Sequence, residues 1–127
     1  VMMKKIIPFA LLFALCSCFE TPERDCKAFK TGKFLFEMEV DGVKKSTTFI
    51  RSENQEIDTY EGKTDTSSIR WINDCEYIIQ KINPKNMAEK KAVSIKILST
   101  TKDTYTFEFN VVGIAEKQIG TVKKLNN

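Results

Sequence analysis

The sequence predicts an all-β domain of about eight short antiparallel strands in an up-and-down meander, closed into a small barrel behind an N-terminal signal segment. Three observations support this fold class. Apolar and polar residues alternate with period two in several segments, short turn-forming stretches separate these segments, and no convincing amphipathic helix interrupts them. A meander of this kind buries its apolar face and hides its edges by closing on itself.

The first 17 residues have the organisation of a secretory leader. Lys4 and Lys5 precede an apolar stretch, Ile6 to Leu15, that is broken only by Pro8. The stretch is too short to cross a bilayer as a helix, which needs about 20 apolar residues, but it fits the apolar region of a signal peptide. We therefore expect residues 1–17 to be a cleaved signal peptide.

The leader ends in Leu15-Cys16-Ser17-Cys18, which resembles a bacterial lipobox. The pattern requires a small residue before the lipidated cysteine, and Ser17 precedes Cys18, whereas the bulky Leu15 precedes Cys16. Cys18 is therefore the expected site of lipid attachment by palmitate and related acyl chains. The alternative is an ordinary signal peptide, cleaved without lipidation.

Residues 18–27 are polar and charged, as expected for a lipidated tether between an anchor and a domain that spans residues 28–127. The leader predicts a protein of the cell envelope, held by its lipid at the outer membrane on the periplasmic or the surface face. Acidic residues after the lipidated cysteine resemble surface-export signals of Bacteroidetes lipoproteins, but here they are interrupted (Glu20, Glu23, Asp25). The membrane face therefore stays open.

The first strand and hairpin are the clearest elements of the domain. From Lys33 to Asp41, apolar side chains fall on one face and charged ones mainly on the other, which is typical of a strand with one solvated face. Asp41-Gly42 suits a two-residue type I′ turn. Such a turn pairs Val40 with Val43 and brings Phe34 opposite Phe49.

The second hairpin leaves its loop length to be chosen. A mostly polar alternating segment, Glu56 to Tyr60, is followed by a turn at Glu61-Gly62-Lys63. The stretches around Trp71 and Tyr77 then form two strands. A two-residue loop would place Trp71 opposite Glu76, whereas a three-residue loop places Trp71 opposite Cys75 and Ile69 opposite Tyr77. We prefer the three-residue loop because it buries the aromatic side chains together.

The remaining strands follow a polar interruption. Residues 82–91 contain Asn83-Pro84 and a charged run, with room for a turn of helix over 85–89. Two alternating segments then place Val93, Ile95 and Ile97, and later Tyr105, Phe107, Phe109 and Val111, each on one face. A last strand is expected around residues 118–125.

Several of these motifs carry a resemblance. The strand count, the opening Lys30-Thr31-Gly32-Lys33-Phe34 and the paired cysteines resemble small lipocalin-like lipoproteins. Arg24-Asp25-Cys26-Lys27 and Trp71-Ile72-Asn73-Asp74-Cys75-Glu76-Tyr77 are similar to short, uncharacterised Bacteroidetes lipoproteins, some of which carry a DNA topoisomerase IV name by automatic transfer. The resemblance implies a location and a fold but no activity, and the chain has no phosphate-binding glycine loop that would support a topoisomerase.

Cys26 and Cys75 are the two cysteines that remain after the leader is removed. In an extracytoplasmic compartment disulfides persist. A bridge between them would close a loop of about 50 residues and stabilise the domain by on the order of 3 to 4 kcal/mol in the chain-entropy model. The alternative is a pair of unpaired thiols, since their spacing does not fit a zinc or redox CxxC site.

Composition argues against several functions. The chain has 20 basic and 17 acidic residues, and a nucleic-acid partner would favour a stronger basic excess. It has no histidine, which removes the commonest general base and metal ligand. We therefore expect no catalytic residues, no metal, no cofactor and no enzymatic activity.

The residues that remain as candidates are aromatic. Trp71, Tyr77, Tyr105, Phe107 and Phe109 form a weak set that would either line a pocket for a hydrophobic small molecule or simply fill the core. Glu37, Glu39 and Asp41 are interpreted as a solvated acidic stripe, and Arg70 is expected to face solvent. The expected function is a barrel that binds a hydrophobic ligand or docks to another envelope protein. The alternative is an inhibitor or assembly factor that acts through its loops, especially residues 82–91.

Overall fold

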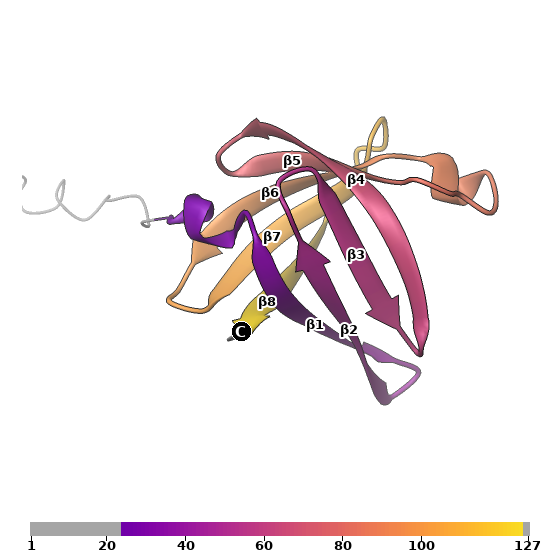
Figure 1. Ribbon diagram of the computed structural model, residues 1–127, viewed down its shortest axis with the longest axis horizontal. Helices are drawn as coiled ribbons and strands as arrows, with labels where there is room; N and C mark the ends of the chain where they lie inside the picture. The colour runs from indigo at the N-terminus through magenta and orange to yellow at the C-terminus, as the bar shows by residue number, and fades with distance from the viewer. Residues whose placement is uncertain (1–23, 126–127) are drawn as a thin grey trace, which may run out of the picture.

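The computed structural model describes residues 24–125, and these form a closed barrel of eight antiparallel strands in sequence order (Figure 1). Each strand pairs with the next one in the chain, and the first pairs with the last. The strands are β1 (Gly32–Val40), β2 (Val43–Arg51), β3 (Gln55–Tyr60), β4 (Lys63–Asn73), β5 (Glu76–Lys81), β6 (Val93–Thr100), β7 (Thr104–Val111) and β8 (Gln118–Leu125). The predicted fold class is therefore confirmed.

The first hairpin has the predicted register, with Val40 opposite Val43 and Phe34 opposite Phe49. Asp41 and Gly42 form its two-residue turn with φ values of 53° and 79°, which is the left-handed conformation that a type I′ turn requires. Local sequence was sufficient here, because the turn residues and the apolar alternation specify the same pairing.

The predicted register of the second hairpin is wrong. Trp71 lies opposite Tyr77 and Ile69 opposite Ile79, with a bulge between Trp71 and Asn73. Asn73 pairs with Glu76, so the loop consists of Asp74 and Cys75. The Asn73 side-chain Oδ1 accepts a hydrogen bond of 2.9 Å from the backbone N–H of Cys75 within this loop. The bulge adds one residue to β4, so that the Trp71 and Tyr77 rings still share a face, with centroids 4.5 Å apart.

One end of the barrel is covered by the short 3₁₀ helix η2 (Cys26–Phe29), and we call this the closed end (Figure 1). Phe29 is 1% exposed and meets the Tyr105 ring edge-on at 5.3 Å. The predicted Cys26–Cys75 disulfide is present and fastens η2 to the β4–β5 loop. The helix η2 therefore covers this end of the barrel and is fixed there by the disulfide.

The opposite end, which we call the open end, carries the β1–β2 and β3–β4 turns and the long connections that follow β5 and β7. Here the inward-facing apolar positions of β1 lose their cover, since Met38 is 43% exposed and Val40 39% exposed. Instead of a helical turn over residues 85–89, the β5–β6 connection holds the 3₁₀ helix η3 (Ala88–Lys90).

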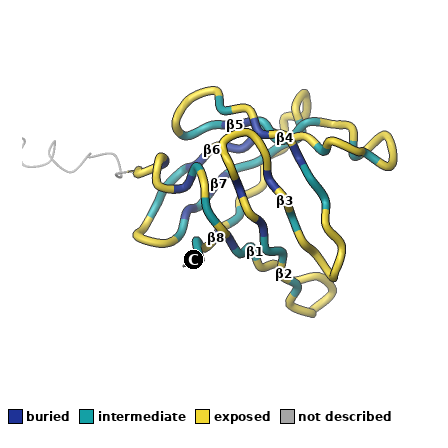
Figure 2. The backbone as a smooth tube through the Cα atoms, in the orientation of Figure 1, coloured by how far each residue is buried: buried dark blue, intermediate teal, exposed yellow. Residues whose placement is uncertain are grey.

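The core lies between these ends and is strongest near the closed end. Figure 2 shows the buried positions spaced along the strands, with the turns exposed. The most deeply buried side chains are Phe29, Phe34, Tyr77, Ile97, Tyr105 and Val122. As predicted, Arg70 is exposed, while Glu37 of the acidic stripe is paired at the surface with Lys44 at 3.6 Å.

The predicted signal peptide (1–17) and the lipid-attachment residue Cys18 lie outside the described residues, as does most of the tether 18–27. Within residues 24–125, no helix has the length and apolar character needed to span a bilayer.

Candidate functional site

The barrel interior holds a charged side chain near the closed end, Arg51, the last residue of β2. It is 2% exposed, because the alternation of β2 places it on the inward face together with Phe49 and Thr47. A buried arginine needs partners for its charge and its N–H groups.

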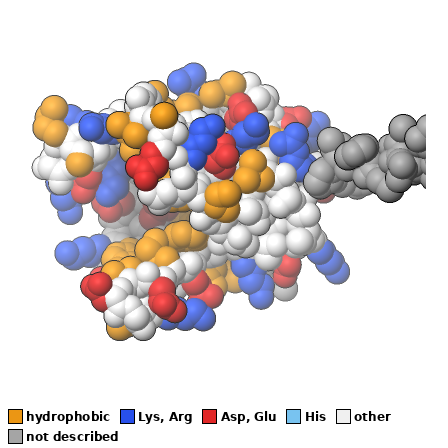
Figure 3. Space-filling model, turned by 180° about the vertical axis from the view of Figure 1, so that it is seen from behind, with side chains coloured by type: hydrophobic (Ala, Val, Ile, Leu, Met, Phe, Trp, Pro, Cys, Tyr) orange, Lys and Arg blue, Asp and Glu red, His pale blue; other side chains and the backbone are white. Residues whose placement is uncertain are grey.

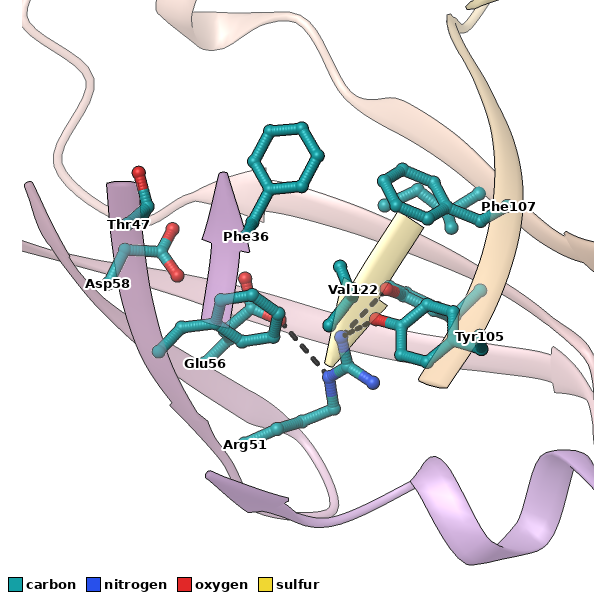
Figure 4. A pocket seen from close by; sticks show the side chains of 11 residues that line it. Phe36, Thr47, Arg51, Glu56, Asp58, Tyr105, Phe107 and Val122 are labelled. Carbon is teal, nitrogen blue, oxygen red and sulfur yellow. Dashed lines mark hydrogen bonds and ion pairs between the residues drawn. The ribbon is translucent and has the colours of Figure 1, made fainter. Parts of the chain in front are cut away.

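The Arg51 guanidinium has hydrogen bonds from all three of its nitrogen atoms (Figure 4). Nε donates to Glu56 Oε1 at 3.1 Å, and Nη1 donates to the backbone oxygen of Phe29 at 2.8 Å. Nη2 donates to the hydroxyl oxygens of Tyr77 at 2.9 Å and Tyr105 at 2.8 Å. One side chain thereby links β2, β3, β5 and β7 to η2.

Aromatic rings surround the same cation. The guanidinium carbon lies 4.8 Å from the Phe34 ring centroid, 5.3 Å from Phe49, 4.9 Å from Tyr77 and 5.7 Å from Tyr105. Burial alone lowers the pKa of Arg51, but its interactions with Tyr77, Tyr105 and Glu56 outweigh burial and raise it. Burial, followed by the neighbouring Tyr105, raises the pKa of Tyr77 well above its usual value. Arg51 therefore stays charged and Tyr77 stays neutral at physiological pH.

A cavity of about 160 Å³ lies beside this cluster, inside the barrel. Its floor is formed by Arg51, Tyr77 and Tyr105, and apolar side chains form much of the remaining lining, namely Phe36, Phe49, Ile95, Phe107 and Val122. The polar part of its lining consists of Thr47, Glu56 and Asp58. In Figure 4, Thr47 and Asp58 lie on the opposite side of the view from Phe107. The cavity thus has an acidic wall formed by Glu56 and Asp58 and an aromatic wall formed by Phe36 and Phe107, with Phe49 beside Asp58 on the neighbouring strand.

Asp58 is the unusual member of this lining. Its Oδ1 atom is closed off from solvent and has no hydrogen-bond partner. Burial, followed by the adjacent Glu56, raises the pKa of Asp58 to about 8, although Arg51 opposes the shift. The Asp58 carboxyl is therefore largely protonated at pH 7.

The acidic pair has a further neighbour on β4. Asp65 lies directly opposite Asp58 across the β3–β4 ladder, but Asp65 is neutralised by Lys81 at 3.4 Å. Lys81 also reaches Glu89 at 3.5 Å. Asp58 itself has no ion pair among the described residues.

A second cavity, of about 280 Å³, adjoins Asp58 towards the open end, and we call it the mouth cavity. It is lined by residues of β3, β4, β5 and β6 and of the segment around η3: Asp58, Ser67, Ile79, Gln80, Lys81, Ala88, Glu89, Lys91 and Val93. Because Asp58 lines both spaces, it stands where the interior cavity meets the mouth.

The structure brings three of the five aromatic candidates into the interior cavity. Tyr77, Tyr105 and Phe107 line it. Trp71 lies nearer the closed end, where the Lys30 ammonium is 5.0 Å from its ring centroid. Phe109 packs against Phe107 with centroids 5.5 Å apart and lines a separate hollow at the open end.

Comparison with known proteins identifies no relative. No family model, curated protein or solved structure matches the chain. The proposals below therefore depend on the geometry and on the sequence patterns described above.

The sequence interpretation missed Arg51, Glu56 and Asp58. A signal was present, since the correct β1–β2 register already placed Phe49 inward and, two residues later, Arg51 as well. The same reasoning continued across β3 pairs Arg51 with Glu56 and Phe49 with Asp58. Predicting these pairs requires the register of β2 with β3, and no turn motif in Ser52 to Asn54 specifies that register.

Proposed function

We propose that this protein is a lipid-anchored, non-enzymatic protein of the bacterial cell envelope whose barrel binds a small ligand with an apolar part. The observation that carries the proposal is the 160 Å³ interior cavity with its aromatic wall. An eight-stranded barrel has an interior that side chains fill or that holds one small ligand, and here a space remains. A cavity near this volume in an engineered protein admits benzene, which sets the ligand's buried part at about one ring.

The position of the N-terminal segment supports an anchor that lies next to the closed end of the barrel. Arg24 donates to the backbone oxygen of Ile97 at 3.1 Å, and the backbone N–H of Asp25 donates to Thr100 Oγ1 at 2.9 Å, both at the closed end. Cys18 precedes Arg24 by six residues, a distance of at most about 20 Å when extended. An acyl anchor at Cys18 would hold the closed end near the membrane and turn the open end away from it.

The Cys26–Cys75 disulfide supports an oxidising compartment such as the periplasm or cell surface. The absence of histidine from the sequence favours binding over acid–base catalysis near neutral pH. The resemblance to Bacteroidetes lipoproteins supports an outer-membrane location.

Native mass spectrometry of the gently purified protein tests ligand binding. We expect a retained small molecule whose signal disappears in Gly120→Val, because a Cβ at Gly120 would already lie 2.8 Å from Phe107 Cζ and 3.0 Å from Phe36 Cε1. Ile119→Val is the matched control, because it places a valine at the neighbouring position of β8, where the side chain is 64% exposed. A wild-type mass free of any adduct would favour docking to another protein over carriage.

Metabolic labelling with a palmitate analogue tests the anchor. The label should be lost in Cys18→Ala and kept in Cys16→Ala, because only Cys18 follows a small residue. Equal labelling of both variants would overturn the assignment of Cys18.

A second candidate function, docking through the β5–β6 connection as an inhibitor or assembly factor, is favoured by exposed apolar side chains there. Met87 is 72% exposed and Ile82 46% exposed. If this connection binds a partner protein of the envelope, Met87→Lys should abolish co-purification of that partner, while Lys85→Gln should not.

A further inference from the structure

The chemistry of the interior cavity identifies a class of ligand, on the assumption that the barrel binds one as proposed above. We propose that the barrel binds an organic ammonium ion of about single-ring size, whose N–H groups donate to Asp58 while its apolar part lies against Phe36 and Phe107.

The cavity lining has an acceptor without a donor, while the donors of its one arginine are already engaged. Arg51 is the cation of the lining, and its three nitrogens already donate to Glu56, Phe29, Tyr77 and Tyr105. Asp58 Oδ1, in contrast, is buried with no donor in reach. A buried acceptor without a donor is destabilising, so a ligand that supplies an N–H group gains what the protein lacks.

The lining holds two carboxyl groups, Glu56 and Asp58, and one cation, Arg51. Glu56 is 6% exposed and neutralises Arg51 within the cluster. When Asp58 ionises, the cavity carries one negative charge that no side chain in residues 24–125 balances by an ion pair, because Lys81 is shared by Asp65 and Glu89. A cationic ligand favours the ionised form of Asp58 and balances its charge, whereas an anionic ligand would lie beside Glu56 and an arginine with few free donors.

The aromatic wall offers Phe36 and Phe107, whose rings are tilted at 58° with centroids 6.0 Å apart. Ring faces attract cations as well as apolar groups. A molecule about the size of a benzene ring therefore fits the wall, and its ammonium group points across the cavity to Asp58. Substituents on the nitrogen would extend into the mouth cavity, which Asp58 also lines.

On the face shown in Figure 3, acidic and basic side chains are interspersed, with hydrophobic groups between them. This face therefore gives no reason to expect a preference for cations.

Calorimetric titration at pH 9, where the Asp58 carboxyl is largely ionised, with three probes of similar size tests the proposal: 2-phenylethylamine, 2-phenylethanol and phenylacetate. We expect the amine to bind about ten- to a hundredfold more tightly than the alcohol, which is the range for hydrogen bonds to charged groups, and phenylacetate to bind more weakly than either. At pH 7, where Asp58 is largely protonated in the free protein, binding of the amine should be weaker and should release a proton, detected as a dependence of the heat on the buffer used.

The discriminating variant is Asp58→Asn, which keeps the size of the side chain and removes its charge. It should abolish the preference for the amine and leave the affinity for the alcohol within about threefold. Asp41→Asn, at the exposed β1–β2 turn, is the matched control and should retain the preference.

Equal binding of the amine and the alcohol by the wild-type protein would overturn the cation preference while leaving ligand binding in place, and this outcome does not depend on how the variant folds. A preference that survives in Asp58→Asn would overturn the role of Asp58. Failure of all three probes would overturn the proposed ligand class, and the adduct in native mass spectrometry would still decide separately whether the barrel binds a ligand.

Discussion

Replacing Arg51 by methionine tests whether the buried cation holds the barrel together. Arg51→Met keeps an unbranched side chain of similar length but removes the guanidinium and its four hydrogen bonds to Glu56, Phe29, Tyr77 and Tyr105. Glu56, 6% exposed, is then a buried carboxylate without its cation. Removing this one side chain therefore deletes one of the contacts that hold η2 on the barrel and leaves a charge uncompensated.

The expected loss of stability follows from that uncompensated charge. Breaking a buried ion pair by removing one partner destabilises a protein by about 3 to 5 kcal/mol. The lost hydrogen bonds belong to the same cluster, so their contributions are not added separately. For a domain of about 100 residues this loss lowers the melting temperature by roughly 14 to 24 °C. It is a large share of the 5 to 15 kcal/mol that is typical of folded domains.

Urea unfolding followed by the fluorescence of Trp71, the one tryptophan of the chain, measures the change. Arg70→Met is the control, because Arg70 is exposed and its loss should change stability by less than about 0.5 kcal/mol. In the double variant Arg51→Met, Glu56→Leu both charges are gone, and at least half of the lost stability should return. A loss below about 1 kcal/mol in Arg51→Met alone, or no recovery in the double variant, would refute the argument.

Three further predictions concern the closed end, the acidic wall and the aromatic wall. Cys26→Ser with Cys75→Ser should lower the free energy of unfolding by about 3 to 4 kcal/mol, because the bridge closes a long loop of sequence separation 49; equal stability of the reduced and oxidised wild type would contradict this. Because the pKa of Asp58 is raised to about 8 in the folded protein, folding favours its protonated form, so this contribution is complete below pH 4 and declines as the pH rises from about 4 to about 8. Urea unfolding across that range should show the decline in wild type and a flatter profile in Asp58→Asn, and identical profiles would disprove the assignment. Gly120→Ala should destabilise the protein by about 1 to 3 kcal/mol and weaken probe binding, since its Cβ lies 2.8 Å from Phe107 Cζ and displaces that ring; unchanged probe affinity would show that the ring moves away from the cavity.

Local patterns were sufficient for the strands and the first hairpin. Asp41-Gly42 tolerates the positive φ angles of its turn, and the alternation that ends in Phe34 and Phe49 supports the same register. The two cysteines that follow the leader were also recognisable as a pair from the compartment that the leader implies. These features depend on residues that are close in sequence or on their chemistry alone.

The strand partner of Trp71 does not follow from local sequence patterns. The two-residue loop and the three-residue loop both imply regular strands on either side, whereas β4 contains a bulge. A bulge shifts the register by one residue, and here the requirement that Trp71 and Tyr77 share the inner face while Cys75 reaches Cys26 favours it. That requirement involves a contact between residues 49 positions apart, which no local pattern contains.

The sequence by itself determined the all-β class, the number of strands and the candidate disulfide, because composition and period-two alternation are local properties of the chain. The tertiary structure decided that the barrel closes around Arg51 and that Glu56 and Asp58 face an aromatic wall. Those positions depend on the registers of β2 with β3 and of β4 with β5, and register across a sheet is set by the packing of all eight strands together.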